Sequence, residues 1–300
     1  MAEELEADDN AEEPAINRSG LVIENRFEIL DLIGRGGMAS VYRARHQQID
    51  LNVAVKILDG DQLTKRDVAR LKVEAQSLNS LFHPNIVKIY SFGLLESGEP
   101  YIVLDLLEGQ TLQALIEKES LLPQLWLIEA FGQICSGLAC AHESGIIHRD
   151  LKPANVMVVP PDEENSFIKI LDFGIACAKN AKGDQRLTKK GEVFGSPLYM
   201  SPEAISGKEI DHRADIYAFG CLMYEAVTGA APFIGNTVIV TYLKHLQEKP
   251  KPFAEAVEGL VISDELESIV FKCMEKDPEK RYQSAEEILV ELKACNVDKG

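Results

Sequence analysis

Residues 148–155 read His-Arg-Asp-Leu-Lys-Pro-Ala-Asn, and residues 172–174, which begin 17 positions after Asn155, read Asp-Phe-Gly. The two strings supply a candidate base in Asp150, a cation in Lys152, and two oxygen ligands for a divalent metal in Asn155 and Asp172. Phosphoryl transfer needs these groups, because it depends on alignment and on neutralising phosphate charge. Their order and spacing therefore indicate a phosphotransfer site.

The composition is that of a folded domain with an acidic head. The chain has 300 residues, 46% apolar and 26% charged, which is enough for one large domain or two lobes. Its net charge is -17, and residues 1–17 hold seven acids and no Lys or Arg. We expect residues 1–24 to form an acidic flexible tail, with partner binding as the alternative. The acidic balance disfavours nucleic acid and anionic membrane as partners, because both require a basic face.

Targeting signals and cysteine motifs are missing from the sequence. No apolar run approaches 18 residues, and the N-terminus is acidic where a secretory signal would be basic and then apolar. The six cysteines include no CxxC pair and no zinc spacing. We expect the cysteines to be free thiols in a reducing, cytoplasmic location. A membrane anchor beyond residue 300 is an open alternative.

The pattern along the chain predicts an α+β fold in two lobes. Three strand-like runs precede any helix, and they are followed by one amphipathic helix and two further strands (residues 27–33, 41–44, 53–58, 68–78, 86–90 and 101–104). Beyond Gly109 the pattern is helical (residues 125–142, 215–227, 266–274 and 285–292). We therefore expect a small antiparallel β-sheet lobe with one main helix and a larger, mainly α-helical lobe, joined near residues 105–109.

Residues 34–41 read Gly-Arg-Gly-Gly-Met-Ala-Ser-Val, with Gly at the first two sites of GxGxxG and Ala at the third. A dinucleotide fingerprint opens a helix, but here strand formers lie on both sides, so the glycines predict a hairpin turn. Without Cβ atoms, backbone N–H groups can approach phosphate oxygens, and the hairpin would cover them. An ordinary Gly-rich turn is the alternative.

Lys56 lies in an apolar strand, where an unpaired ammonium is costly to bury. Nucleotide phosphates are one source of negative charge. Glu74 is another, because it borders the apolar stripe of the first helix. A Lys56–Glu74 salt bridge would direct the ammonium toward the phosphates. A solvated helix face is the alternative for Glu74.

These strings resemble the eukaryotic-type protein kinase family over about residues 27–293, and several are most similar to bacterial Ser/Thr protein kinases. The resemblance implies a bilobal protein-kinase fold at residues 25–296, with a small lobe at 25–106, a large lobe at 107–296 and a C-terminal end at 297–300. It also implies ATP and Mg²⁺, with Mn²⁺ as an alternative, and transfer of the γ-phosphoryl group to Ser/Thr hydroxyls of proteins, including the chain itself. Self-association as a homodimer through the small lobe is a further implication.

The resemblance assigns roles to particular residues. It implies catalytic roles for Asp150, Lys152, Lys56 and Glu74, and metal binding by Asn155 and Asp172. It implies nucleotide binding by Ile33, Gly34, Gly36, Gly37, Ala39, Val41, Ala54, Lys56, Asp105 and Leu107. A kinase-like scaffold that binds nucleotide without turnover is the contrasting interpretation.

Residues 195–203, Gly-Ser-Pro-Leu-Tyr-Met-Ser-Pro-Glu, resemble the segment that forms the floor for a peptide substrate, with Ser196 beside the acceptor. Such a floor disfavours a small-molecule kinase. We expect Glu203 to form a buried ion pair with Arg281, and losing one partner would cost roughly 3–5 kcal/mol.

The segment before this floor departs from the family pattern. Relatives often have a phosphorylated Thr where this chain has Lys190, which leaves Thr188 as the candidate regulatory phosphosite. Phospho-Thr188 or Glu192 could order the segment by approaching Arg149. The acidic insert at residues 160–165 has no functional explanation.

Overall fold

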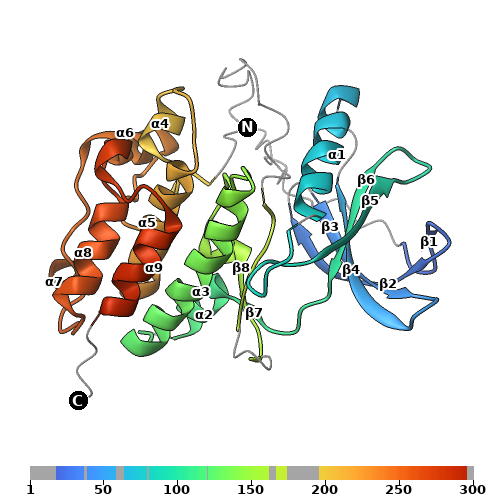
Figure 1. Ribbon diagram of the computed structural model, residues 1–300, viewed down its shortest axis with the longest axis horizontal. Coiled ribbons are helices and arrows are strands. Elements are labelled where there is room, and N and C mark those ends of the chain that lie inside the picture. Colours follow the sequence, from blue (N-terminus) through green and yellow to red (C-terminus); the bar gives the residue numbers. More distant parts are fainter. Residues whose placement is uncertain are drawn as a thin grey trace, which may run out of the picture.

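The computed structural model describes residues 18–36, 39–58, 64–79, 81–119, 121–161, 167–173 and 196–295. Figure 1 shows a sheet-based lobe and a helical lobe joined through the middle of the molecule. The small lobe is a six-stranded sheet in the order β1-β2-β3-β4-β6-β5, with every neighbouring pair antiparallel. Its strands are β1 (Val22–Ile23), β2 (Phe27–Gly36), β3 (Ala39–His46), β4 (Leu51–Leu58), β5 (Ile89–Leu94) and β6 (Pro100–Asp105). One helix, α1 (Lys65–Asn79), accompanies the sheet.

The alternation of side chains explains how the small lobe builds its core. On β3, Tyr42, Ala44 and His46 are buried while Arg43 and Arg45 between them are exposed. This is the period of two that a half-buried strand requires. The apolar side of the sheet forms its own cluster, which includes Phe27 and Val55. On its other side α1 contributes Leu71 and Leu78 to the main core of the molecule.

The small lobe begins earlier in the chain than the boundary at residue 25 that the sequence predicts. Strand β1 pairs with β2 through Val22↔Glu28 and Ile23↔Phe27. Glu24 accepts a hydrogen bond of 2.7 Å from the Tyr101 hydroxyl, and Arg18 forms an ion pair with Glu99. Residues 18–24 therefore belong to the folded lobe, because these long-range partners hold them there. No local pattern in the sequence indicates such partners.

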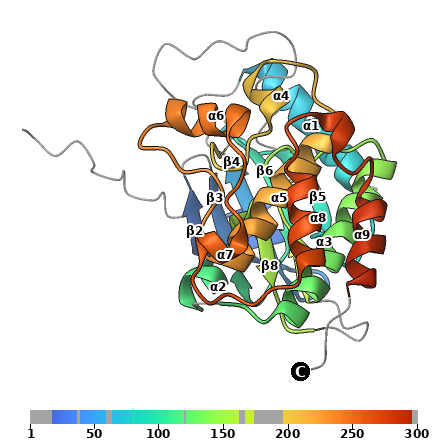
Figure 2. The ribbon, with the colours of Figure 1, turned by 90° about the vertical axis from the view of Figure 1, so that its left-hand side faces the viewer.

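The large lobe is built around α5 (Arg213–Thr228), which is buried along almost all of its length. Around it lie α2 (Leu112–Lys118), α3 (Gln124–Glu143), α4 (Pro202–Ile205), α6 (Val238–Gln247), α7 (Phe253–Ala256), α8 (Asp264–Cys273) and α9 (Ala285–Ala294). Figure 2 shows α3, α5, α8 and α9 packed side by side. Ser and Thr side chains cap several of these helices by accepting from the third residue beyond, as Ser263 and Ser284 do for α8 and α9. The fold predicted from the sequence is confirmed.

A small sheet lies where the lobes meet. Strands β7 (Gln110–Thr111), β8 (Val156–Val158) and β9 (Ile168–Ile170) form it in that order. The link from β6 enters it through Gly109, whose φ is 152° and where a Cβ would lie 2.1 Å from the Val158 carbonyl oxygen. Only glycine fits that approach. The short helix Pro153–Asn155 directly precedes β8, so this sheet carries the loops that hold the candidate site.

Within the described ranges, no helix combines the length and the apolar character needed to cross a membrane.

Candidate active site

The loop that carries Asp150 is anchored on the central helix of the large lobe. Asp215, at the start of α5 and 1% exposed, accepts hydrogen bonds from the backbone N–H of His148 at 2.7 Å and of Arg149 at 2.9 Å. The Nε2 atom of His142 lies 2.8 Å from the same carboxylate. Arg149 adopts a left-handed backbone with φ of 64°, which costs a non-glycine residue free energy unless its surroundings impose it. The Asp215 carboxylate is one such constraint.

The environment of Asp215 also keeps it charged. Burial alone would raise the pKa of this carboxyl, but the hydrogen bond and charge of His142 and the backbone of His148 outweigh it and lower the pKa below its usual value. Asp215 is a residue of the candidate site that the sequence reasoning did not assign. The sequence does contain a signal for this role. Asp215 is an acid in an otherwise apolar helix, and a buried acid has to be paired.

Asp150 lies between a cation and an amide. Lys152 Nζ donates to Asp150 Oδ2 at 2.7 Å and to the Ser196 hydroxyl at 2.9 Å. Asn155 Nδ2 donates to the backbone oxygen of Asp150 at 2.8 Å and to its Oδ2 at 3.1 Å. The structure thus brings together Asp150, Lys152, Asn155 and Ser196, including a residue 41 positions beyond Asn155 in the sequence.

Asn155 is oriented so that its oxygen remains for another ligand. Because Nδ2 donates both hydrogen bonds to Asp150, Oδ1 is the atom that this side chain can offer to a cation. Amide and carboxylate oxygens are the ligands that Mg²⁺ prefers. The donor set of Asn155 and Asp172 therefore fits a hard divalent metal.

In the structure Lys56 pairs with Asp172, a partner that the sequence analysis did not assign to it. Its Nζ lies 2.7 Å from Asp172 Oδ1, across the two lobes. Asp172, like Arg149, has a left-handed backbone, with φ of 52°. Glu74 lies in α1, but its side chain is outside the described part of the structure, so a Lys56–Glu74 pair stays a prediction.

Phe173, the residue after Asp172, anchors this segment in the hydrophobic core. Phe173 is buried, its ring centroid lies 4.6 Å from that of His148, and it lines a small cavity with Leu78 and Ile89 of the small lobe. His148 Nε2 lies 2.7 Å from the Leu171 carbonyl oxygen, and burial lowers the pKa of this imidazole. A neutral His148 that donates to Leu171 thus connects the Asp150 loop to the Asp172 segment.

The predicted nucleotide-binding residues lie on the β2–β3 hairpin, on β4 and on the link. Gly34 pairs with Val41 and Gly36 with Ala39, which confirms that antiparallel strands lie on both sides of the predicted turn. Val41 in turn pairs with Lys56, and Ala54, two residues before Lys56, faces the same side of β4. The remaining residues are Ile33 on β2, which is exposed, Asp105 at the end of β6, and Leu107 on the link.

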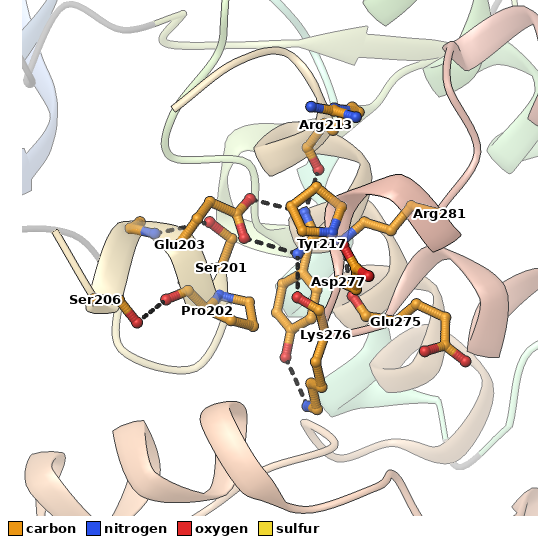
Figure 3. Close-up of polar contacts among 12 residues, drawn as sticks. Ser201, Pro202, Glu203, Ser206, Arg213, Tyr217, Glu275, Lys276, Asp277 and Arg281 are labelled. Carbon is orange, nitrogen blue, oxygen red and sulfur yellow. Dashed lines mark hydrogen bonds and ion pairs between the residues drawn. The ribbon is translucent and has the colours of Figure 1, made fainter. Parts of the chain in front are cut away.

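The predicted ion pair below the floor segment is confirmed. Arg281 Nη1 and Nη2 each donate at 2.7 Å to Glu203, one bond to each carboxylate oxygen, as Figure 3 shows. The Arg281 side chain is fully buried and also donates to the Arg213 carbonyl oxygen at 2.8 Å. Burial would raise the pKa of Glu203, but the hydrogen bonds and charge of Arg281 lower it overall.

Several predicted residues lie outside the described part of the structure. They are Gly37, Thr188, Lys190, Glu192 and residues 162–165 of the acidic insert.

A small antiparallel lobe, a helical lobe, and a carboxylate held by lysine and asparagine near their junction define the class of bilobal phosphotransferases. The family model described as protein kinase domain matches residues 27–291. The chain belongs to the protein kinase family.

Named relatives agree with this assignment. The chain is 39% identical over 282 residues to serine/threonine-protein kinase pkn3 of Myxococcus xanthus, covering 93% of this chain and 52% of the relative. It is 37% identical over 276 residues to serine/threonine-protein kinase PknB of Mycobacterium tuberculosis, covering 90% and 43%. The chain therefore spans about half the length of the curated relatives it matches, or less.

Solved structures show the same fold. The kinase domain of Mycobacterium tuberculosis PknI superposes with a TM-score of 0.72 at 22% identity, covering 92% of this chain and 98% of that one. A crystal structure of Rad53 in complex with AMP-PNP gives a TM-score of 0.73 at 26% identity, covering 88% and 64%.

Proposed function

We propose that this chain transfers the γ-phosphoryl group of ATP to Ser/Thr hydroxyls of proteins, including its own. The observation that carries the proposal is the set of contacts around Asp150, in which Lys152 bridges the Asp150 carboxylate and the Ser196 hydroxyl. A family fold alone does not establish turnover, so the proposal rests on this arrangement of the site.

Asp150 orients the attacking hydroxyl and accepts its proton. Its carboxylate is fixed on one oxygen by Lys152 and Asn155, so the second oxygen is available to an acceptor hydroxyl. Lys152 neutralises negative charge as the phosphoryl group moves. Because phosphoryl transfer is mainly positioning and charge stabilisation, this requires no strongly shifted acid or base.

Asn155 Oδ1 and the Asp172 carboxylate would hold Mg²⁺, or Mn²⁺ as an alternative. A metal bound there would supply positive charge to the phosphate oxygens. Lys56, whose Nζ lies 2.7 Å from Asp172 Oδ1, would pair with phosphate.

The nucleotide lies under the β2–β3 hairpin and against Ile33, Val41, Ala54 and the link. Glycine positions on the hairpin and the small Ala54 side chain leave room for a ligand next to the backbone. Support comes from Rad53, a relative in fold whose crystal structure is a complex with AMP-PNP, an ATP analogue.

The test is mass spectrometry of autophosphorylation with Mg²⁺-ATP on the wild type, Asp150→Asn and the control Asp264→Asn, which changes an exposed carboxylate on α8. We expect phosphate uptake by the wild type and the control, and none by Asp150→Asn. Peptide mapping would also show whether Thr188 carries phosphate. Equal uptake by Asp150→Asn would remove Asp150 from the reaction. Nucleotide binding with no uptake by any of the three would favour a kinase-like scaffold.

A homodimer through the small lobe, a cytoplasmic location and a regulatory role for Thr188 stay predictions.

A further inference from the structure

Helix α6 has an unusual distribution of side chains. Its two buried residues are polar, Thr241 and His245, whereas Ile239 is 66% and Leu243 46% exposed. Thr241 finds partners within its own segment, since its hydroxyl lies 3.2 Å from the Thr237 carbonyl oxygen and accepts from Gly235 N–H. His245 has no such local explanation, because its contacts lie on other elements.

A buried chain of polar groups determines the protonation of His245. Lys276 Nζ lies 3.1 Å from the Tyr217 hydroxyl, which lies 2.9 Å from His245 Nδ1; Figure 3 shows the first of these contacts. An ammonium can only donate, so the Tyr217 oxygen accepts from Lys276, and its own proton can go to Nδ1. In that arrangement the proton of a neutral His245 is on Nε2.

The protein interior keeps His245 in this neutral state. Burial and the charge of Lys276 lower the pKa of His245 to about 3. Burial also lowers the pKa of Lys276 to about 8. The ammonium lies against the ring of Phe233, 4.0 Å from its centroid, and Phe233 packs edge-on against His245 at 4.9 Å. Each member of the group therefore contacts the next.

In this chain of hydrogen-bonded groups, the Nε2–H group of His245 is left without an acceptor in the described part of the structure. The His245 side chain is fully buried, and Nε2 has no hydrogen-bond partner among the described residues. The backbone of Leu198 and Pro197 is nevertheless close enough to the ring to raise the pKa of His245 against the larger effect of burial. A buried donor without a partner is destabilising, and a small shift of this backbone toward Nε2 would give it one.

The same backbone belongs to the floor segment. Pro197 and Leu198 directly follow Ser196, whose hydroxyl accepts from the Lys152 that also binds Asp150. Tyr199 N–H closes the turn on the Ser196 carbonyl oxygen at 3.0 Å. A displacement of Pro197 or Leu198 would therefore also move Ser196, which contacts Lys152.

We propose that His245 is a positioning residue for the protein acceptor: its Nε2–H binds a backbone carbonyl of Pro197 or Leu198 in the arrangement that receives the acceptor, while Tyr217 and Lys276 hold the imidazole in place. This inference rests on the proposed kinase function, because it gives residues 196–199 the role of floor.

Two substitutions of His245 test the contributions of its two ring nitrogens separately. The amide of His245→Gln can occupy the place of Nε2, whereas that of His245→Asn reaches only the place of Nδ1. With the Asp150→Asn variant of the same chain as acceptor, we expect His245→Asn to raise the acceptor KM about five-fold, the equivalent of one hydrogen bond of about 1 kcal/mol. His245→Gln should stay close to the wild type, and the KM for ATP should not change in either variant.

The matched control is Tyr224→Phe. It removes a hydroxyl from the same helix as Tyr217, one that donates to the Lys251 carbonyl oxygen at 3.1 Å. A purely structural role for His245 would lower the melting temperature of His245→Asn, His245→Gln and Tyr224→Phe alike and leave every acceptor KM unchanged. That result would overturn the inference.

A second measurement is independent of catalysis. Hydrogen–deuterium exchange at the amides of residues 198–200 should be faster in His245→Asn than in the wild type, His245→Gln or Tyr224→Phe. Equal exchange in all four proteins would refute positioning by His245. If exchange changes as expected but the wild type phosphorylates no acceptor, the kinase proposal fails while the contact between His245 and the segment stands.

Discussion

At the scale of single residues, the candidate site uses common side chains whose roles come from their neighbours. Asn155 becomes a candidate metal ligand because its amide nitrogen is already bound to Asp150. Lys56 is only partly buried and finds its negative charge in Asp172, 2.7 Å away. The role of each group therefore depends on its partner, which for Lys56 lies 116 positions away in the sequence.

Lys56→Met tests this balance at one residue. Loss of the ammonium should lower the phosphoryl-transfer rate by about 10²–10³-fold, the range for removing one group that stabilises transition-state charge. The fold should be retained, since methionine fills similar space. Rates measured at saturating Mg²⁺-ATP, beside Lys249→Met at an exposed position, would check this. A Lys56→Met rate close to that of the wild type would exclude Lys56 from catalysis.

At the scale of elements, a buried ion pair joins α4 to the segment between α8 and α9. Glu203 belongs to α4, and Arg281 follows the short helix Pro278–Lys280. Arg281 also donates to the carbonyl oxygens of Glu275 and Arg213. The pair therefore holds the end of the floor segment against the start of α5.

Arg281→Met should lower the free energy of unfolding by roughly 3–5 kcal/mol, because it leaves the Glu203 carboxylate buried without a partner. The control is Arg43→Met, which breaks an exposed pair with Asp31 and should cost about 1 kcal/mol or less. Urea unfolding followed by circular dichroism would measure both. Similar losses for the two variants would mean that burial adds nothing to the Glu203–Arg281 pair.

At the scale of the whole molecule, buried titratable groups make stability depend on pH. Burial lowers the pKa of His148 and His245, so these groups bind fewer protons in the folded state than in the unfolded chain. Their penalty begins as pH falls below the ordinary value of 6.5. Glu203 and Asp215 also have lowered pKa values. Their stabilisation is present above the ordinary carboxyl range and is lost as pH falls through the lowered values.

We therefore expect the free energy of unfolding to decrease in two stages on acidification, first below about pH 6.5 from the histidines and then below about pH 4.5 from the carboxyls. His245→Gln should flatten the first stage. Urea unfolding at a series of pH values would show this, and a flat profile between pH 7 and 5 would contradict the assignment to buried histidines.

Much of the fold could be predicted because its signals are local. Alternating apolar residues, the Gly-rich turn and the long apolar run at 215–227 each depend on neighbours a few positions away, and each matches an element of the structure. The entry of residues 18–24 into the small lobe was missed, because Glu24 and Arg18 are held by Tyr101 and Glu99.

The sequence by itself determined the family and the chemical groups at the site, because Asp150, Lys152, Asn155 and Asp172 lie in two short strings whose spacing is specific. Only the tertiary structure decided how these groups are held. Asp215 binds the backbone beside Asp150 from 65 residues away, and Tyr217, His245 and Lys276 meet from three separate segments. Such pairings depend on how α3, α5 and α6 pack, and packing is a property of the whole chain that no local spacing encodes.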